Sequence, residues 1–170
     1  MTTSNNGKKN ELNTMNFHRE LYVVGKLDVA GEVVSKSQFS ATMSASADAA
    51  VTLTAANVLT LANGGIWSFT GNALTADRAL TLPTAALLVA AAKESYTNVR
   101  VGDSYQFYVV NQDDTNEIDV TPGTGGTEAI AGGASVAVAA NNIASVIVKL
   151  TNITASSEAY DMFVFTEATA

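Results

Sequence analysis

The one histidine and one acidic stretch are the residues of this chain that come closest to catalytic or metal-binding chemistry. His18 lies in a polar stretch, where nothing in the sequence would pack and orient it as the base of a Ser-His-Asp triad. One imidazole is too few for a histidine-based zinc site. Because the chain has no cysteine, disulfides, thiolate metal sites and cysteine catalysis are excluded. We therefore expect His18 to be an exposed side chain without a catalytic role.

A cluster of acidic and amide side chains between positions 113 and 119 offers oxygen atoms of the kind that bind calcium. Its members are Asp113, Asp114, Asn116, Glu117 and Asp119. The glycine that an EF-hand loop needs at a fixed offset is missing, so we interpret the cluster as a solvated hairpin loop. The other acidic residues are scattered, and they show no pair placed for glycoside hydrolysis.

Three further motifs have structural interpretations that we prefer to functional ones. The stretch "PGTGGT" (122–127) has no following lysine and fits a tight β turn better than a phosphate-binding loop. The sequon Asn152-Ile153-Thr154 matters only in a secretory pathway. Trp67, Tyr105 and Tyr108 are candidates for a sugar site, but aromatic residues on strands more often belong to a core or an interface. We therefore predict no catalytic, cofactor-binding or metal-binding residues, no cofactor and no enzymatic activity.

Charge is distributed unevenly along the 170 residues. Residues 1–36 carry five basic and four acidic side chains, about +1, whereas residues 37–170 carry four basic and twelve acidic ones, about −8. Nucleic-acid binding depends on neutralising phosphates with lysine and arginine, so we expect no nucleic-acid partner. We also expect no membrane partner, because no run of about 18 apolar residues is present and the polar start does not resemble a signal peptide.

The pattern of apolar residues predicts an N-terminal arm (1–36) followed by an all-β domain (37–170). Residues 1–20 read as an extended arm, and residues 21–36 read either as a first strand or as an arm that docks on a neighbour. Beyond them we expect eight to ten short strands at intervals of about ten residues, including strands in 38–61, and a turn at "NGG" (63–65). One helix is predicted at 85–95, capped by Thr84 after Pro83 ends a strand. This spacing is typical of a β-sandwich or jelly roll, and no repeat of fixed period is visible.

Strands at 104–110, 135–139 and 144–150 carry apolar residues on both faces. A lone sandwich normally leaves one face of each sheet in water, so two apolar faces suggest that a further surface is covered. Either another subunit or the helix at 85–95 can cover it. We favour a homotrimer, because cyclic symmetry uses the same patch three times.

The stretch from 78 to 165 resembles the C-terminal modules of virion surface proteins of tailed phages: decoration, head-fibre and tail-fibre proteins. The likeness is carried by "RALTLPTAALLVAA", "VGDSYQFYVVN", "VTPGTGGT" and the closing "SVIVKLTNITASSEAYDMFVF". It implies a small jelly-roll-like module, commonly a homotrimer, on the outside of a virus particle, and it supplies no catalytic residues to transfer.

From this resemblance we expect a capsid decoration or cement protein located on the capsid surface of the virion. Its partners would be its own copies and the major capsid protein or another virion protein, reached through the N-terminal arm by strand addition. The alternative is a head- or tail-fibre module that recognises a host surface glycan.

Overall fold

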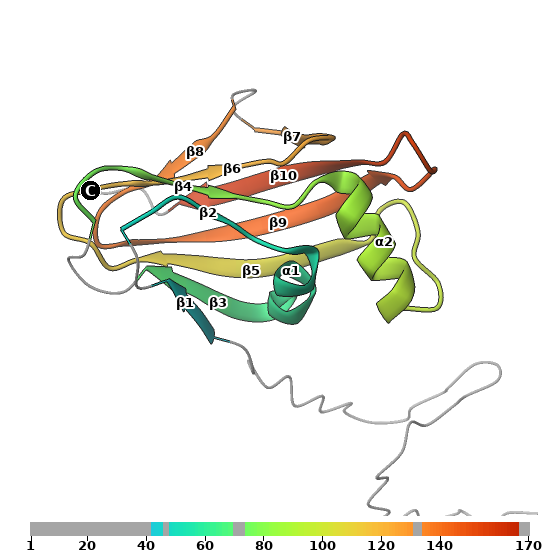
Figure 1. Ribbon diagram of the computed structural model, residues 1–170, viewed down its shortest axis with the longest axis horizontal. Coiled ribbons are helices and arrows are strands. Elements are labelled where there is room, and N and C mark those ends of the chain that lie inside the picture. Colours follow the sequence, from blue (N-terminus) through green and yellow to red (C-terminus); the bar gives the residue numbers. More distant parts are fainter. Residues whose placement is uncertain (1–41, 46–47, 70–73, 131–133, 167–170) are drawn as a thin grey trace, which may run out of the picture. The chain divides into compact units, whose positions relative to one another are not determined.

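The computed structural model describes residues 42–45, 48–69, 74–130 and 134–166. These residues form a body in which strands outnumber helices (Figure 1), and this confirms the expectation of a β-rich fold. The predicted arm (1–36) and His18 lie outside the described residues. The division of the chain after residue 36 therefore stays a prediction.

The larger of two sheets, sheet A, contains six of the described strands in the spatial order β1-β3-β5-β9-β10-β7. Their bounds are β1 Thr42–Ala45, β3 Asn63–Phe69, β5 Ser104–Asn111, β7 Gly126–Glu128, β9 Asn142–Asn152 and β10 Ala159–Thr166. The central strand β5 lies between β3 and β9 and has buried residues at alternate positions. The strand predicted at 104–110 is therefore an inner strand of its sheet.

The smaller sheet, sheet B, contains four of the described strands in the order β2-β4-β6-β8. Their bounds are β2 Val51–Thr52, β4 Arg78–Thr81, β6 Ile118–Thr121 and β8 Val136–Val138. Two helices accompany the sheets in the described part of the chain: α1, Ala55–Leu61, and α2, Ala85–Ser95. Both sheets contribute buried side chains to one shared core, for example Phe107 and Val146 from sheet A and Leu80 and Val120 from sheet B.

From β1 to β8 the chain alternates between the two sheets, so that each strand of sheet A is followed by one of sheet B. As a result β1, β3 and β5 run parallel to one another, and so do β2, β4 and β6. Of the ladders in the described residues, five are parallel and three are antiparallel. Jelly rolls are built from antiparallel strands. The predicted jelly-roll arrangement is therefore not confirmed by these mixed sheets.

The expectation of a single helix was wrong, because the described residues contain α1 as well as α2. The stretch 51–61 was assigned to strands from its alternation, yet only β2 is a strand there. Thr54 forms a capping box: its Oγ1 accepts from the Asn57 N–H at 3.1 Å, and Asn57 Oδ1 accepts from the Thr54 N–H at 2.9 Å. Val58 and Leu61, three residues apart, then lie on the same side and are buried. The cap and this spacing favour helix over strand.

The predicted helix at 85–95 is confirmed with these bounds. Thr84 caps it as expected, since its Oγ1 accepts from the Leu87 N–H at 3.3 Å. The buried residues of α2 recur at the spacing of one helical face: Ala85, Leu88, Val89 and Ala92. This face belongs to the shared core, so α2 packs against the inner side of the sheets.

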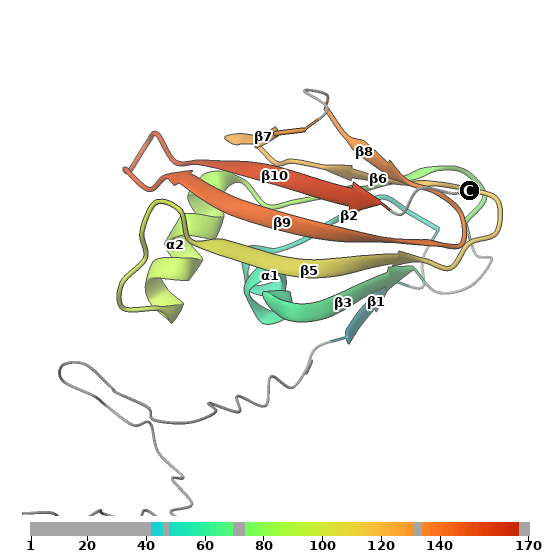
Figure 2. The same cartoon turned by 180° about the vertical axis from the view of Figure 1, so that it is seen from behind.

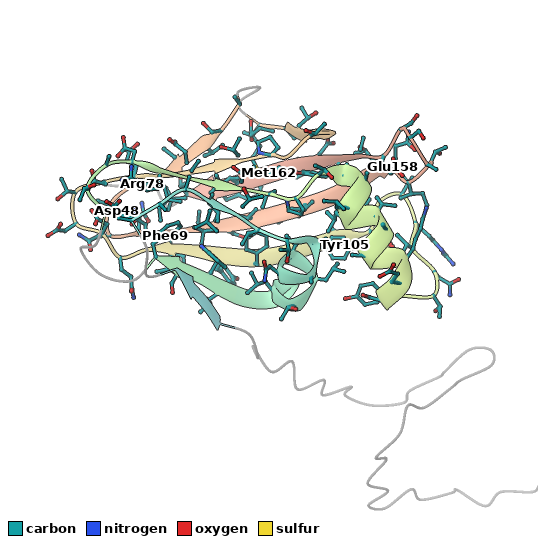
Figure 3. The ribbon with its side chains drawn as sticks, viewed as in Figure 1. Asp48, Phe69, Arg78, Tyr105, Glu158 and Met162 are labelled. Atoms are coloured by element: carbon teal, nitrogen blue, oxygen red, sulfur yellow. The ribbon has the colours of Figure 1, made fainter. Side chains whose placement is uncertain are left out.

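An ion pair fixes one end of sheet B. Arg78 Nη2, at the start of β4, lies 2.6 Å from Asp48 Oδ1, just before β2, and Figure 3 shows both side chains at the same end of the body. Asp48 also accepts from the Thr75 N–H at 3.1 Å. The hydrogen bonds of Thr75 are the main reason that the pKa of Asp48 is lowered. These contacts tie together the segments that enter the parallel strands β2 and β4.

The glycines of "NGG" do not form the predicted turn. Asn63 and both glycines lie in β3, where the register against β5 shifts between Asn63 and Ile66. Gly64 has a φ of 80°, a conformation that glycine adopts without steric cost. The signal therefore marks an irregularity at the start of a strand, and α1 connects to β3 through Ala62 instead of through a hairpin.

Candidate functional site

The acidic stretch at 113–119 is held by backbone donors and is not arranged around a cation. Asp113 is buried, and its Oδ1 accepts from the N–H groups of Thr115 at 3.0 Å and Asn116 at 2.7 Å. Its Oδ2 accepts from the Leu74 N–H at 3.0 Å. These bonds, led by the one from Asn116, lower the pKa of Asp113. Among the described residues no group of three or more histidine and acidic side chains is placed to hold a metal ion.

The neighbouring Asn111 shows that this loop serves the structure. Its side-chain Nδ2 donates to the Asn116 carbonyl at 2.9 Å and to the Val138 carbonyl at 3.0 Å. The loop after β5 is thereby joined to β8 of the other sheet. Calcium would need these oxygens to be free. The predicted solvated hairpin loop was wrong in three respects: Asp113 is buried, the loop crosses from β5 of sheet A to β6 of sheet B, and Asp119 lies in β6.

The three aromatic residues considered for a sugar site do not come together. Trp67 and Tyr105 are buried members of the core, and Trp67 contacts Phe69 edge to face at 6.4 Å between ring centroids. Tyr108 lies on the opposite face of β5 and is half-buried. Because alternate residues of a strand point to opposite faces, these side chains cannot line one groove.

The glycine-rich stretch 122–127 serves a close backbone crossing. A Cβ atom at Gly123 would overlap the carbonyl oxygens of Leu82 and Pro83, and one at Gly126 would overlap the ring of Tyr160. The end of the stretch forms β7, which pairs with β10 in parallel. The structural interpretation of these glycines is consistent with this packing, although the predicted turn also contains the start of a strand.

The residues of the sequon form a local turn. Asn152 ends β9, and its Oδ1 accepts from the Thr154 N–H at 2.9 Å. The Asn152 side chain is thereby used by its own backbone, as in other Asx turns.

An apolar groove of about 610 Å³ lies where β2 and β4 lead into α1 and α2. Its walls are mostly small apolar and threonine side chains: Thr52, Leu53, Thr54, Ala55, Ala56, Thr81, Leu82, Pro83, Thr84, Leu87, Ala90, Ala91, Glu94, Gly123 and Thr124. Leu87 is 61% exposed at its rim. One acidic side chain, Glu94, is the sole ionisable group among these lining residues, so the groove offers contact surface but no pair of groups for acid–base chemistry.

The outer face of sheet A is the second candidate surface. Ladder partners share a face, so side chains from four neighbouring strands meet there: Ile66, Tyr108, Val110, Ile143, Ile147, Phe163 and Phe165. Phe165 is 52% exposed and Ile143 37% exposed, and the others are half-buried. Figure 2 shows this side of sheet A toward the viewer, with sheet B and both helices behind it. Of the described elements, none covers this face.

This arrangement bears on the two explanations for strands that are apolar on both faces. The helix at 85–95 does not provide the cover, because α2 packs its apolar side into the core on the inner side of the sheet. Sequence reasoning identified the two-faced character of β5 and β9. It missed Ile66, Phe163 and Phe165, whose place on the same face depends on the strand order.

Comparison of the chain with models of protein families, with curated proteins and with solved structures found no match. In the part of the chain that the structure describes, no helix is long and apolar enough to span a membrane.

Proposed function

We propose that this chain is a non-enzymatic virion structural protein, a capsid decoration or cement protein that binds the outer capsid surface and stabilises the shell. The proposal rests on the resemblance of residues 78–165 to surface modules of tailed phages. One structural observation supports the homotrimer that the resemblance implies: the outer face of sheet A is a broad apolar surface. Exposed apolar patches of this kind mark contacts between proteins. The location that follows is the capsid surface of the virion.

The proposed attachment uses residues 1–36 as an arm, with the major capsid protein or another virion protein as its partner. This part of the sequence is near neutral, whereas residues 37–170 carry about −8. Strand addition gains affinity from main-chain hydrogen bonds and needs few particular side chains. The acidic body would then face away from the shell and would not bind nucleic acid.

The proposed module is jelly-roll-like in having two stacked sheets, and it is proposed to act as a homotrimer. Its parallel ladders, such as β3 with β5 and β4 with β6, distinguish it from a strictly antiparallel jelly roll. The proposed likeness to phage surface modules therefore rests on two stacked sheets and on the order of the sequence motifs. Helices α1 and α2 are insertions that follow β2 and β4.

The alternative function, recognition of a host glycan by a fibre module, calls for exposed tryptophan or tyrosine side chains in a groove. The three aromatic residues first considered do not meet this requirement, because Trp67 and Tyr105 are buried. The outer face of sheet A does bring Tyr108, Phe163 and Phe165 together. Capsid decoration is therefore preferred on the sequence resemblance, and binding to capsids and to cells separates the two functions.

Binding to assembled capsids tests the proposal. Purified full-length protein added to empty capsids that lack it is expected to cosediment with them and to raise their melting temperature. A variant lacking residues 1–20 is expected to bind more weakly while its far-UV circular dichroism stays that of a folded β protein. Failure of saturating protein to bind capsids or to change their melting temperature would refute the function. Full binding by the truncated variant would show that residues 1–20 are not needed for attachment to the capsid.

Binding of the same protein to intact host cells separates the two functions. A fibre module is expected to bind cells on its own and to be competed by the host polysaccharide. A cement protein is expected to bind capsids and not cells. The opposite pattern would replace the proposed function with the alternative.

A further inference from the structure

The outer face of sheet A has three successive rows of ladder partners in which apolar side chains dominate. One row joins Gln106, Ile147 and Phe163, and the next joins Tyr108, Ser145 and Phe165. The third row joins Val110 to Ile143, and Ile66 extends the second row onto β3. Large apolar side chains from β3, β5, β9 and β10 therefore form one continuous patch.

Water contact with this patch is costly to the isolated domain. Burying apolar surface is favourable roughly in proportion to the area removed from water. An antiparallel pair exposed on one side normally carries polar residues there, as the partners Ser104 and Lys149 do at the far end of the same face. The three apolar rows therefore lack the polar side chains that the far end of the same face presents to solvent.

Charge indicates which occupant fits the patch. Residues 37–170 carry about −8, so two copies of this body repel each other through most of their surface. In the described ladder rows of β3, β5, β9 and β10 on this face, the charged side chains are Lys149 and Asp161, which are ladder partners and have opposite charges. The face therefore carries no net charge. It is where two acidic copies can approach with the least electrostatic repulsion.

We propose that the outer face of sheet A is the surface through which copies of this chain associate, with Phe165 and Ile143 as its main contacting side chains. The most exposed large apolar side chains of the patch are these two, at 52% and 37%. Aromatic side chains that become fully desolvated in a contact tend to dominate its free energy. In a cyclic trimer each copy turns this same face toward the threefold axis, where adjacent parts of the face contact one another.

This inference specifies the contact face for the homotrimer proposed above, and it is tested without capsids. A chain that assembles through this face but does not bind capsids would refute the proposed function alone. A chain that binds capsids as a monomer would refute the inference alone.

Sedimentation velocity of the full chain across a dilution series is the first measurement. The natural chain is expected to sediment as an oligomer that dissociates on dilution, and Phe165→Asp is expected to weaken association by at least about tenfold. Leu87→Asp is the matched control, because Leu87 is also large, apolar and exposed but lies on α2 beside the groove. It is expected to associate as the natural chain does. A monomer at every concentration, or an oligomer weakened only by Leu87→Asp, would overturn the inference.

A second measurement does not depend on the stability of Phe165→Asp. Since the chain has no cysteine, Ser145→Cys places one thiol on the outer face, and Ala86→Cys places one on the exposed side of α2. Labelling of the thiol at position 145 by a maleimide is expected to slow as the protein concentration rises, and labelling at position 86 is expected to stay constant. If the thiol at position 145 were protected equally at all concentrations, the chain would cover its own face. If it were labelled rapidly at all concentrations, nothing would cover the face. Either result would overturn the proposal.

Discussion

The hydroxyl group of Tyr160 donates a hydrogen bond to the carbonyl oxygen of Pro83 at 3.1 Å, although the two residues lie 77 positions apart. Tyr160 belongs to β10 of sheet A, and Pro83 lies between β4 of sheet B and α2. The same hydroxyl accepts from the Gly123 N–H at 2.7 Å. One buried side chain therefore joins a strand of one sheet to the two segments that follow neighbouring strands of the other.

Tyr160→Phe is expected to lower the free energy of unfolding by about 1–3 kcal/mol at pH 7, because the buried carbonyl of Pro83 and the partly buried N–H of Gly123 lose their shared partner. Denaturant unfolding followed by circular dichroism measures the change. Tyr96→Phe is the control, since Tyr96 is 45% exposed and its replacement should leave stability nearly unchanged. Equal stability of Tyr160→Phe and the natural chain would show that these hydrogen bonds contribute nothing net.

The same residue predicts how stability changes at high pH. Burial raises the pKa of Tyr160 from 10.0 to about 12, against a smaller lowering effect of the bond from Gly123. Between these values the folded state keeps a proton that the unfolded state has released, so stability falls as pH rises from about 10 to about 12. The slope from this one group is at most about 1.4 kcal/mol per pH unit. The unfolding free energy of Tyr160→Phe is expected to fall less steeply over this range than that of the natural chain. The pH dependence left in the variant comes in part from Tyr105, whose pKa is also raised, mainly by burial.

Gly123→Ala is expected to destabilise the fold by about 3 kcal/mol or more, because the new Cβ would meet backbone oxygens that cannot move aside without displacing β4 and α2. Gly102→Ala is the matched control. A Cβ at Gly102 meets nothing within 4 Å, and the cost there is the strain of a φ of 98°, about 1 kcal/mol. Thermal melting of both variants distinguishes overlap from strain. A smaller loss for Gly123→Ala than for Gly102→Ala would contradict the packing described for the glycine-rich stretch.

Asp113→Asn is expected to lower the melting temperature at pH 7, because an amide cannot accept from as many backbone N–H groups as the carboxylate does. The lowered pKa of Asp113 gives the sign of the pH dependence: its contribution is present above the unfolded pKa, near 3.8, and is lost as pH falls through the lower folded pKa. The variant should therefore lose less stability on acidification than the natural chain does. Asp114→Asn, at an exposed neighbour, is the control. If Asp113→Asn and the control melted alike both at pH 7 and at acidic pH, the hydrogen bonds of Asp113 would not stabilise the fold.

Local patterns predicted the elements whose signals lie within a few residues. The helix at 85–95 was predicted because Pro83 ends a strand and Thr84 provides a cap, and both signals are local. The strand at 104–110 was predicted from a short run that is apolar on both faces, and the structure extends it to Asn111. Helix α1 was missed because Val51 and Leu53 alternate like a strand immediately before Thr54, so that the cap was read as part of a continuing strand.

The candidate surface was beyond sequence reasoning for a different reason. That β5 and β9 are apolar on both faces can be read from alternation alone. That Ile66 lies beside Tyr108, and Phe165 beside Ser145, depends on the order β3-β5-β9-β10 and on the ladder registers. These are long-range properties set by packing of the whole domain. The parallel pairing of β3 with β5 could not be predicted from the sequence either, because it follows from the alternation of the chain between two sheets.

Thr54→Ala is expected to destabilise the domain by about 1 kcal/mol, the usual cost of removing an N-cap hydroxyl. The loss has two parts, because Thr54 Oγ1 accepts from the Asn57 N–H and also donates to Asn57 Oδ1 at 2.8 Å. Thr60→Ala, at an exposed position of the same helix, is the control and should be neutral or slightly stabilising, since alanine has the higher helix propensity. Chemical denaturation of the two variants gives the difference. If both variants had the same stability, the capping box would not be what makes residues 55–61 a helix, and burial of Val58 and Leu61 alone would account for α1.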